Sequence, residues 1–216
     1  MGRAVEREGR TTVSYALEMS TGDMRQVVRL LTAVERTPAQ EEHLGRVRER
    51  CKALDVILES QGVHYDIPVI RALEELIDGT PSRTVSPAYA HAFHEVVTSC
   101  FSYTTDLGSW RRMSWFQTVS NDLARNGIPP ALLPEAFLFS GPPLPLPHPG
   151  DVHPRIGTLS IQRAAEAATA YTAVLDRVHP DCQDTVRRFT EAFRFELNDW
   201  RPNSPADTLF FWFDRP

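Results

Sequence analysis

TLFFWFD, residues 208–214, is the stretch that decides the fold. Four consecutive aromatic residues run from Phe210 to Phe213, and no polar residues alternate with them. A short apolar run soon after a proline-containing break predicts a strand that is buried on both faces. Because four aromatic residues at an exposed edge would promote aggregation, we expect this strand to pair with another strand and to pack against helices.

The other clear strand pattern is TVSYALEM, residues 12–19. Apolar side chains alternate there with small or polar ones, which predicts a strand with one buried face. The apolar members are Val13, Tyr15, Leu17 and Met19. We therefore expect the two strands to belong to one small sheet. Residues 1–11 are polar and charged, and they are predicted to form a flexible N-terminus.

Between the two strands, the spacing of apolar residues predicts mostly helix. Thr37 and Pro38 supply an N-cap and a first-turn proline for a helix that ends at Gly62. Further helices are predicted at residues 24–31, 67–78, 86–108, 110–126, 160–175 and 180–200. The predicted fold class is α+β: a single, predominantly helical domain over residues 12–216, with a small sheet that includes both terminal strands.

GPPLPLPHPGDVHPRIG, residues 141–157, has three interpretations. A flexible linker would be richer in Gly, Ser or charge, whereas this stretch contains Leu144, Leu146, Val152 and Ile156. A proline-rich ligand would need a basic residue close to its P-x-x-P spacing. We favour the third interpretation, an ordered extended crossover that joins two helical halves of one domain.

Composition narrows the classes of function. The formal net charge is −5, from 23 basic and 28 acidic residues, which argues against nucleic acid as the partner. No apolar run reaches the roughly 18 residues that a transmembrane helix needs, so no membrane partner is expected. The 3 cysteines form no C-x-x-C motif, which favours a reduced, cytoplasmic protein. The expected partner is a protein or a small molecule, and the oligomeric state stays open.

The segment from Pro147 to Gly157 follows the pattern P-x-P-x-D-x-x-P-x-I-G and resembles a segment of an uncharacterised family of actinomycete proteins. VSYALEM near the start, ALEELIDG at residues 72–79 and the closing LFFWF are also similar to blocks of that family. The resemblance implies one domain. It implies no activity and supplies no catalytic residues.

The candidate metal ligands are His91, His94 and Glu95 in the sequence AHAFHE. Their spacing places them on one helical face, and His148, Asp151 or His153 would supply a third ligand. The order H-x-x-H-E matches neither H-E-x-x-H nor H-x-x-E-H. We therefore interpret this face as a solvated polar surface and expect no structural metal.

The candidate proton-transfer group is formed by Asp151, His153 and Arg155 in the extended stretch. Asp and His together are able to move protons, and loops often carry function. The structural alternative is that Asp151 binds its own backbone in a turn while Arg155 forms a salt bridge.

Two classes of function follow. The absence of G-x-S-x-G, of phosphate-binding glycine loops and of any cofactor motif favours a non-enzymatic binding protein of the immunity, accessory or regulatory type. No cofactor is expected. The alternative is a small enzyme of bacterial specialised metabolism that uses acid–base or metal chemistry at the candidate residues above. That alternative would gain if the His91 face and the Asp151 loop met around one apolar pocket.

Overall fold

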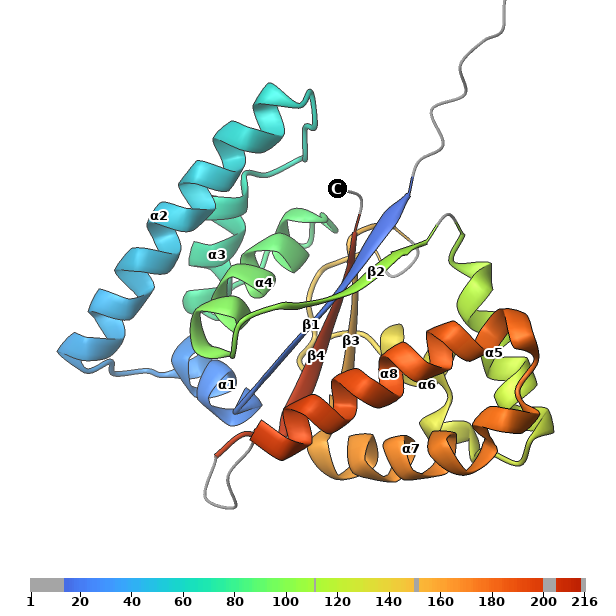
Figure 1. Ribbon diagram of the computed structural model, residues 1–216. Helices are drawn as coiled ribbons and strands as arrows, with labels where there is room; N and C mark the ends of the chain where they lie inside the picture. The colour runs from blue at the N-terminus through green and yellow to red at the C-terminus, as the bar shows by residue number, and fades with distance from the viewer. Residues whose placement is uncertain (1–13, 111, 150–151, 200–204, 215–216) are drawn as a thin grey trace, which may run out of the picture.

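A computed structural model describes residues 14–110, 112–149, 152–199 and 205–214 of the chain. Within these residues an antiparallel sheet of four strands has the order β2-β1-β4-β3. The strands are β1 (Tyr15–Gly22), β2 (Thr105–Trp110), β3 (Arg155–Ser160) and β4 (Thr208–Asp214). The prediction that the two terminal strands share a sheet is confirmed, since β1 and β4 are direct neighbours at its centre (Figure 1).

The pairing of β1 with β4 runs from Ala16 opposite Asp214 to Gly22 opposite Thr208. Strand β1 extends three residues past the predicted end at Met19, because its second half pairs with Phe210 and Leu209 of β4. The predicted flexible segment, residues 1–11, lies outside the described residues, so that prediction stays open.

Strands β2 and β3 were not predicted, and this is the main correction to the expected fold. The helix expected over residues 86–108 is instead α4 (Ala88–Cys100), followed by β2. Gly108 has φ +113°, and the β1–β2 register shifts between Leu17 and Glu18. Strand β2 is therefore irregular and gains its conformation from pairing with β1. A local sequence pattern does not reveal such pairing.

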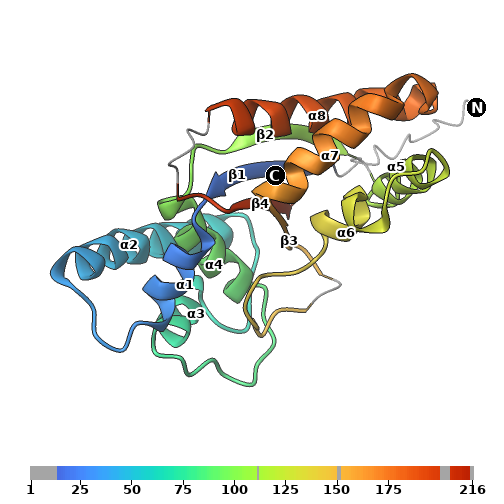
Figure 2. The same cartoon turned by 90° about the horizontal axis from the view of Figure 1, so that it is seen from below.

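The helices form two groups, one on each face of the sheet (Figures 1 and 2). The first group is α1 (Met24–Thr32), α2 (Pro38–Ser60), α3 (Val69–Ile77) and α4. The second is α5 (Ser114–Arg125), α6 (Pro134–Leu138), α7 (Ile161–Val174) and α8 (Pro180–Asp199). Short 3-10 turns occupy Pro130–Leu132 and Leu175–Arg177. None of the described helices is long and apolar enough to cross a membrane.

The N-cap predicted at Thr37 is confirmed. The Thr37 hydroxyl accepts a bond from the Gln40 backbone N–H, and the Gln40 side chain accepts one from the Thr37 N–H, which completes a capping box at α2. Asp23 caps α1 and Ser160 caps α7 through their side chains. These local signals explain why helix positions were predicted better than strands.

Strand β4 divides two hydrophobic cores. Phe211 and Phe213 pack among α5–α8, and Phe210 and Trp212 pack among α1–α4. The predicted burial of this strand on both faces is confirmed, since Leu209 to Phe213 are all buried. Burial of one large apolar side chain stabilises a fold by about 1.5–3 kcal/mol. The strand therefore contributes to both cores at once.

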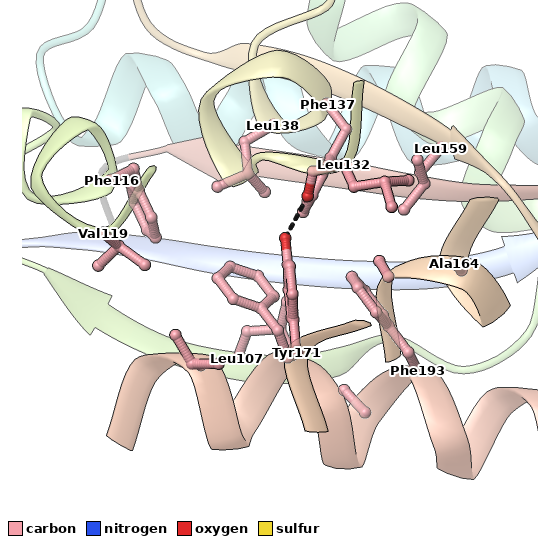
Figure 3. Packing of buried hydrophobic residues seen from close by; sticks show 14 of the residues in the cluster. Leu107, Phe116, Val119, Leu132, Phe137, Leu138, Leu159, Ala164, Tyr171 and Phe193 are labelled. Atoms are coloured by element: carbon pink, nitrogen blue, oxygen red, sulfur yellow. Dashed lines mark hydrogen bonds between the residues drawn. The ribbon is translucent and has the colours of Figure 1, made fainter. Parts of the chain in front are cut away.

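The core beside α5–α8 also contains a buried tyrosine (Figure 3). The Tyr171 hydroxyl donates a hydrogen bond to the backbone carbonyl of Leu132, so the polar end of this ring is satisfied within the core. Phe137 and Phe193 pack beside it in the same cluster.

The described part of the proline-rich stretch contacts both the helices and the sheet. The Ser86 N–H donates to the Pro147 carbonyl at 2.8 Å, and Leu144 and Leu146 pack against the core of α1–α4. The Gly141 N–H donates to the Ile156 carbonyl of β3 at 3.0 Å, so the start of the stretch lies along the outer side of β3. These contacts favour the crossover interpretation, and resistance of the stretch to proteolysis stays a prediction.

Candidate functional site

His91 lies inside the molecule, so the interpretation of its helix face as solvated was wrong. Its side chain is 6% exposed and packs edge-on against Trp212, with ring centroids 5.3 Å apart. Tyr65 OH lies 2.9 Å from His91 Nε2. Helix α4 contacts α1, α2 and α3 on one side and the sheet on the other, so nearly its whole circumference is buried.

His94 and Glu95 occupy the same side of α4 and have protein partners. The His94 ring stacks on Trp212 at 4.1 Å, and Arg50 Nε lies 2.6 Å from Glu95 Oε2. Burial disfavours the Glu95 carboxylate, but His94 and the charge of Arg50 outweigh it and hold its pKa below the ordinary value. His94 Nδ1 also lies 3.8 Å from Glu95 Oε1. The predicted ligands thus contact an indole ring, a guanidinium group and each other.

Burial is the main influence on the protonation states of His91 and Tyr65. Burial, with a smaller effect of His94, lowers the pKa of His91 to about 4. Burial and the charge of Asp214 raise the pKa of Tyr65 to about 12. At neutral pH the group therefore consists of a neutral imidazole and a protonated phenol, with Asp214 Oδ2 4.0 Å from His91 Nε2.

His153, one of the predicted proton-transfer residues, lies on the other face of the sheet. His153 stacks on Tyr15 at 4.3 Å, and its Nδ1 lies 3.3 Å from the Phe213 carbonyl. Tyr15 and Phe213 belong to the core of α5–α8, whereas His91 packs on Trp212 in the core of α1–α4. The sheet thus separates His153 from His91.

The remaining predicted residues do not complete a single site. Arg155 lies in β3, and its guanidinium carbon is 5.6 Å from the centre of the Phe139 ring. His148 is near enough to His91 for its charge to depress the pKa of His91. Asp151 lies outside the described residues. Across the described ranges, no group of three or more His, Cys, Asp or Glu side chains is arranged to hold a metal ion.

The three cysteines are not activated nucleophiles. Burial raises the pKa of Cys51 to about 12, and it also raises the pKa of Cys100 and Cys182. Cys100 is half-buried, with its Sγ 3.7 Å from His43 Nε2. With raised pKa values, these thiols stay protonated at neutral pH.

A pocket that sequence reasoning missed lies between β2 and α8, which run side by side (Figure 2). Its volume is about 550 Å³, and it is lined by Thr105, Asp106, Leu107, Arg188, Glu191, Ala192 and Phe195. We call it the β2–α8 pocket. Phe195, which is 59% exposed, forms part of the pocket wall. The pocket was missed because β2 was not predicted, although a phenylalanine off the apolar stripe of α8 was a usable signal.

Gly108 has a backbone conformation that favours glycine, with φ +113°. A Cβ atom at this position would also lie 2.7 Å from Arg188 Nη1, so a side chain here would displace the end of that arginine. The Gly108 N–H donates to Asp106 Oδ1 at 2.7 Å, which holds the irregular turn of β2. Gly108 therefore helps to position Asp106 at one rim of the pocket.

Comparison with known proteins identifies the family. The family described as a domain of unknown function (DUF7691) matches residues 13–212. The chain belongs to DUF7691. The match covers β2 and α8 completely and β1 and most of β4, so the β2–α8 pocket lies inside the DUF7691 region. No curated protein and no solved structure matches the chain.

The resemblance inferred from sequence is confirmed as far as membership in a family of unknown function. DUF7691 assigns no role to any residue, so function has to be argued from the site itself. In this DUF7691 chain, carboxylates outnumber basic groups in the lining of the β2–α8 pocket. Asp184 binds Arg188 at 2.9 Å, while Asp106 and Glu191 add two carboxylates to the lining.

Proposed function

We propose that this DUF7691 protein is a non-enzymatic binding protein that recognises another protein through the β2–α8 pocket. The observation that carries the proposal is an apolar pocket of about 550 Å³ beside an edge strand. Leu107, Ala192 and the exposed ring of Phe195 give it apolar surface. A pocket of this size accepts one or two side chains of a partner.

The edge strand suggests how the partner binds. Among the described strands, β2 pairs with β1 alone. The backbone of an edge strand can pair with an extended segment of another chain, while an adjacent pocket selects its side chains. Because the β1–β2 register shifts at Leu107, we expect the added segment to be short and to lie beside Thr105 to Leu107.

The charges define the chemistry of the partner. Asp184 compensates Arg188, whereas Asp106 and Glu191 leave the rim negative. A partner segment with a basic residue beside an apolar one complements this rim. We therefore propose an extended protein segment with an apolar side chain in the pocket and a Lys or Arg next to Glu191.

The test is selection of peptides from a random displayed library on the immobilised protein, followed by affinity measurement. Enriched peptides should combine an apolar and a basic residue. Phe195→Ser should weaken their binding at least about tenfold. Glu191→Lys should also weaken their binding, and more so at low salt than at high salt. Val34→Ser, at a fully exposed valine outside the pocket, is the matched control.

Two results would overturn the proposal. One is that no peptide is enriched over an unrelated protein. The other is that Phe195→Ser and Val34→Ser bind the selected peptides equally well. Amide chemical shifts that move in residues 105–110 and 188–195 on peptide addition would locate the contact on this pocket.

The enzyme alternative has one supporting observation. Tyr65 OH lies 2.9 Å from a buried His91 whose pKa is about 4, and shifted pKa values are common at catalytic sites. It ranks second because the sheet separates His91 from His153. Its test is exposure of wild type and His91→Gln to a broad set of hydrolase substrates, where turnover lost in the variant would promote it.

The cellular setting is part of the same proposal. Three free cysteines, two of them buried, suit a reducing compartment, and we propose a cytoplasmic location. An actinomycete origin stays a prediction from the sequence resemblance, and a place in specialised metabolism stays part of the enzyme alternative.

A further inference from the structure

A second pocket lies between α1 and the beginning of α2, away from the β2–α8 pocket. Its volume is about 430 Å³, and its polar lining comes from Gln26, Arg29, Gln40, His43 and Arg46. We call it the α1–α2 pocket. Among the described residues that line it, Arg29 and Arg46 carry a permanent positive charge, and none carries a carboxylate. Such a lining favours an anionic ligand.

The two arginines have donors to offer a ligand. Arg29 Nη2 lies 3.6 Å from Asp23 Oδ2, and Arg46 Nη1 lies 2.8 Å from Glu42 Oε1. Each guanidinium carries five N–H donors, so contact with one carboxylate does not exhaust it. The two carboxylates themselves are not part of the pocket lining.

His43 adds a ring nitrogen whose state is defined by its neighbours. The Ser99 hydroxyl donates to the Val96 carbonyl at 2.6 Å, so it accepts a bond from His43 Nε2 at 2.8 Å. The ring proton is then on Nε2, and Nδ1 carries a lone pair. Burial lowers the pKa of His43, and the charges of Arg46 and Arg50 lower it further.

We infer that the α1–α2 pocket binds a small molecule through its phosphate group. Two guanidinium groups and a histidine that becomes protonated match the three terminal oxygens of a phosphate monoester, whereas a carboxylate has only two. The volume of about 430 Å³ exceeds the space that phosphate alone fills and lies within the range of small-molecule pockets. The side-chain amides of Gln26 and Gln40 can bind hydroxyl groups of the remaining part.

This inference is independent of the proposed protein partner, since the two pockets share no lining residue. A bound dianion beside His43 favours the imidazolium form. Phosphate binding therefore links to proton uptake at this ring, which gives a readout that needs no known activity.

The experiment follows the His43 ring by NMR across a pH titration, with and without inorganic phosphate. The pKa of His43 should rise when phosphate is present. Glucose 6-phosphate should bind more tightly than inorganic phosphate, and glucose should not bind. Arg46→Gln and Arg29→Gln should each weaken phosphate binding about tenfold.

Arg187→Gln is the matched control, because this arginine lies on α8 beside Asp184 and lines neither pocket. It should leave phosphate affinity unchanged. An unchanged pKa of His43 in saturating phosphate would overturn the inference. Equal loss of affinity in Arg187→Gln and Arg46→Gln would also overturn it, since binding would then follow net charge. If glucose 6-phosphate binds no better than phosphate, the small-molecule assignment is wrong.

Discussion

His94 stacks on Trp212, with ring centroids 4.1 Å apart and an angle of 23° between the planes. This contact joins α4 to β4, and His91 meets the same indole edge-on at 5.3 Å. A polar pair that looked suitable for metal in the sequence thus forms part of an aromatic packing layer. Both histidine rings therefore pack against Trp212.

Trp212→Ala should destabilise the protein by about 3–5 kcal/mol, because it removes a buried indole and leaves a cavity between α4 and the sheet. Urea unfolding followed by circular dichroism measures the change. Tyr103→Ala, at a tyrosine that is 98% exposed, is the control and should stay within about 0.5 kcal/mol of wild type. A comparable loss in both variants would contradict the role given to Trp212.

Deletion of residues 208–216 should give insoluble or unfolded protein. The deletion removes β4, which pairs with β1 on one side and β3 on the other and supplies side chains to both cores. A typical domain is stable by only about 5–15 kcal/mol, and the loss of several buried aromatic residues would remove much of that stability. Soluble expression with a cooperative thermal transition would instead make β4 dispensable.

His91 should make stability fall as the pH falls from about 6.5 to about 4. Its pKa is about 4 in the folded protein and 6.5 for an ordinary histidine, so in this window the unfolded chain binds a proton that the folded protein does not. The effect is on the order of 3 kcal/mol. Glu75, whose pKa is lowered to about 2 chiefly by its bond from Tyr89, acts at lower pH, between about 4.5 and 2.

His91→Gln tests the contribution of His91 to this pH dependence. The free energy of unfolding of the variant should depend less on pH between about 6.5 and 4 than that of wild type. Denaturant unfolding at several pH values gives both curves. Parallel curves would show that His91 titrates alike in both states.

Metal analysis of protein purified without a histidine tag should show far less than one equivalent of zinc. His91 and His94 contact Trp212, and Glu95 is bound by Arg50, so their side chains have protein partners in place of a metal. Stoichiometric metal that disappears in His91→Ala would refute this expectation and strengthen the enzyme alternative.

Limited proteolysis of the folded protein should cut within residues 1–11 before it cuts between 141 and 157. The bond from Ser86 to Pro147 and the packing of Leu144 and Leu146 oppose the local opening that a protease needs. Mass spectrometry of the first fragments identifies the order of cleavage. Early cleavage inside the proline-rich stretch would support a linker between two domains.

The elements that sequence predicted are those with strong local signals. Thr37 with Gln40 and Ser160 mark helix starts through caps, and the aromatic run of β4 marks a strand without help from its neighbours. Strand β2 has no such signal, because Gly108 interrupts it and its pairing with β1 is irregular. Its conformation depends on a partner distant in the sequence.

The candidate residues show a second limit of sequence reasoning. The polar residues around His91 predicted a solvated face for α4, but the helix is covered on both sides, so His91 is buried. Periodicity reports a contrast between faces and does not report how many neighbours a helix has. The β2–α8 and α1–α2 pockets arise from elements that meet only in the folded chain.

The central place of β4 has a consequence for synthesis on the ribosome. Strand β4 follows every other described element in the chain, yet it fills the gap between β1 and β3. Until β4 is translated, β1 and β3 each lack their shared neighbour, and the aromatic layer on both faces is incomplete. Pairing across nearly the whole sequence is slow to form, so the nascent chain carries open strand edges until late in translation. Chaperones that shield such edges would act in this interval.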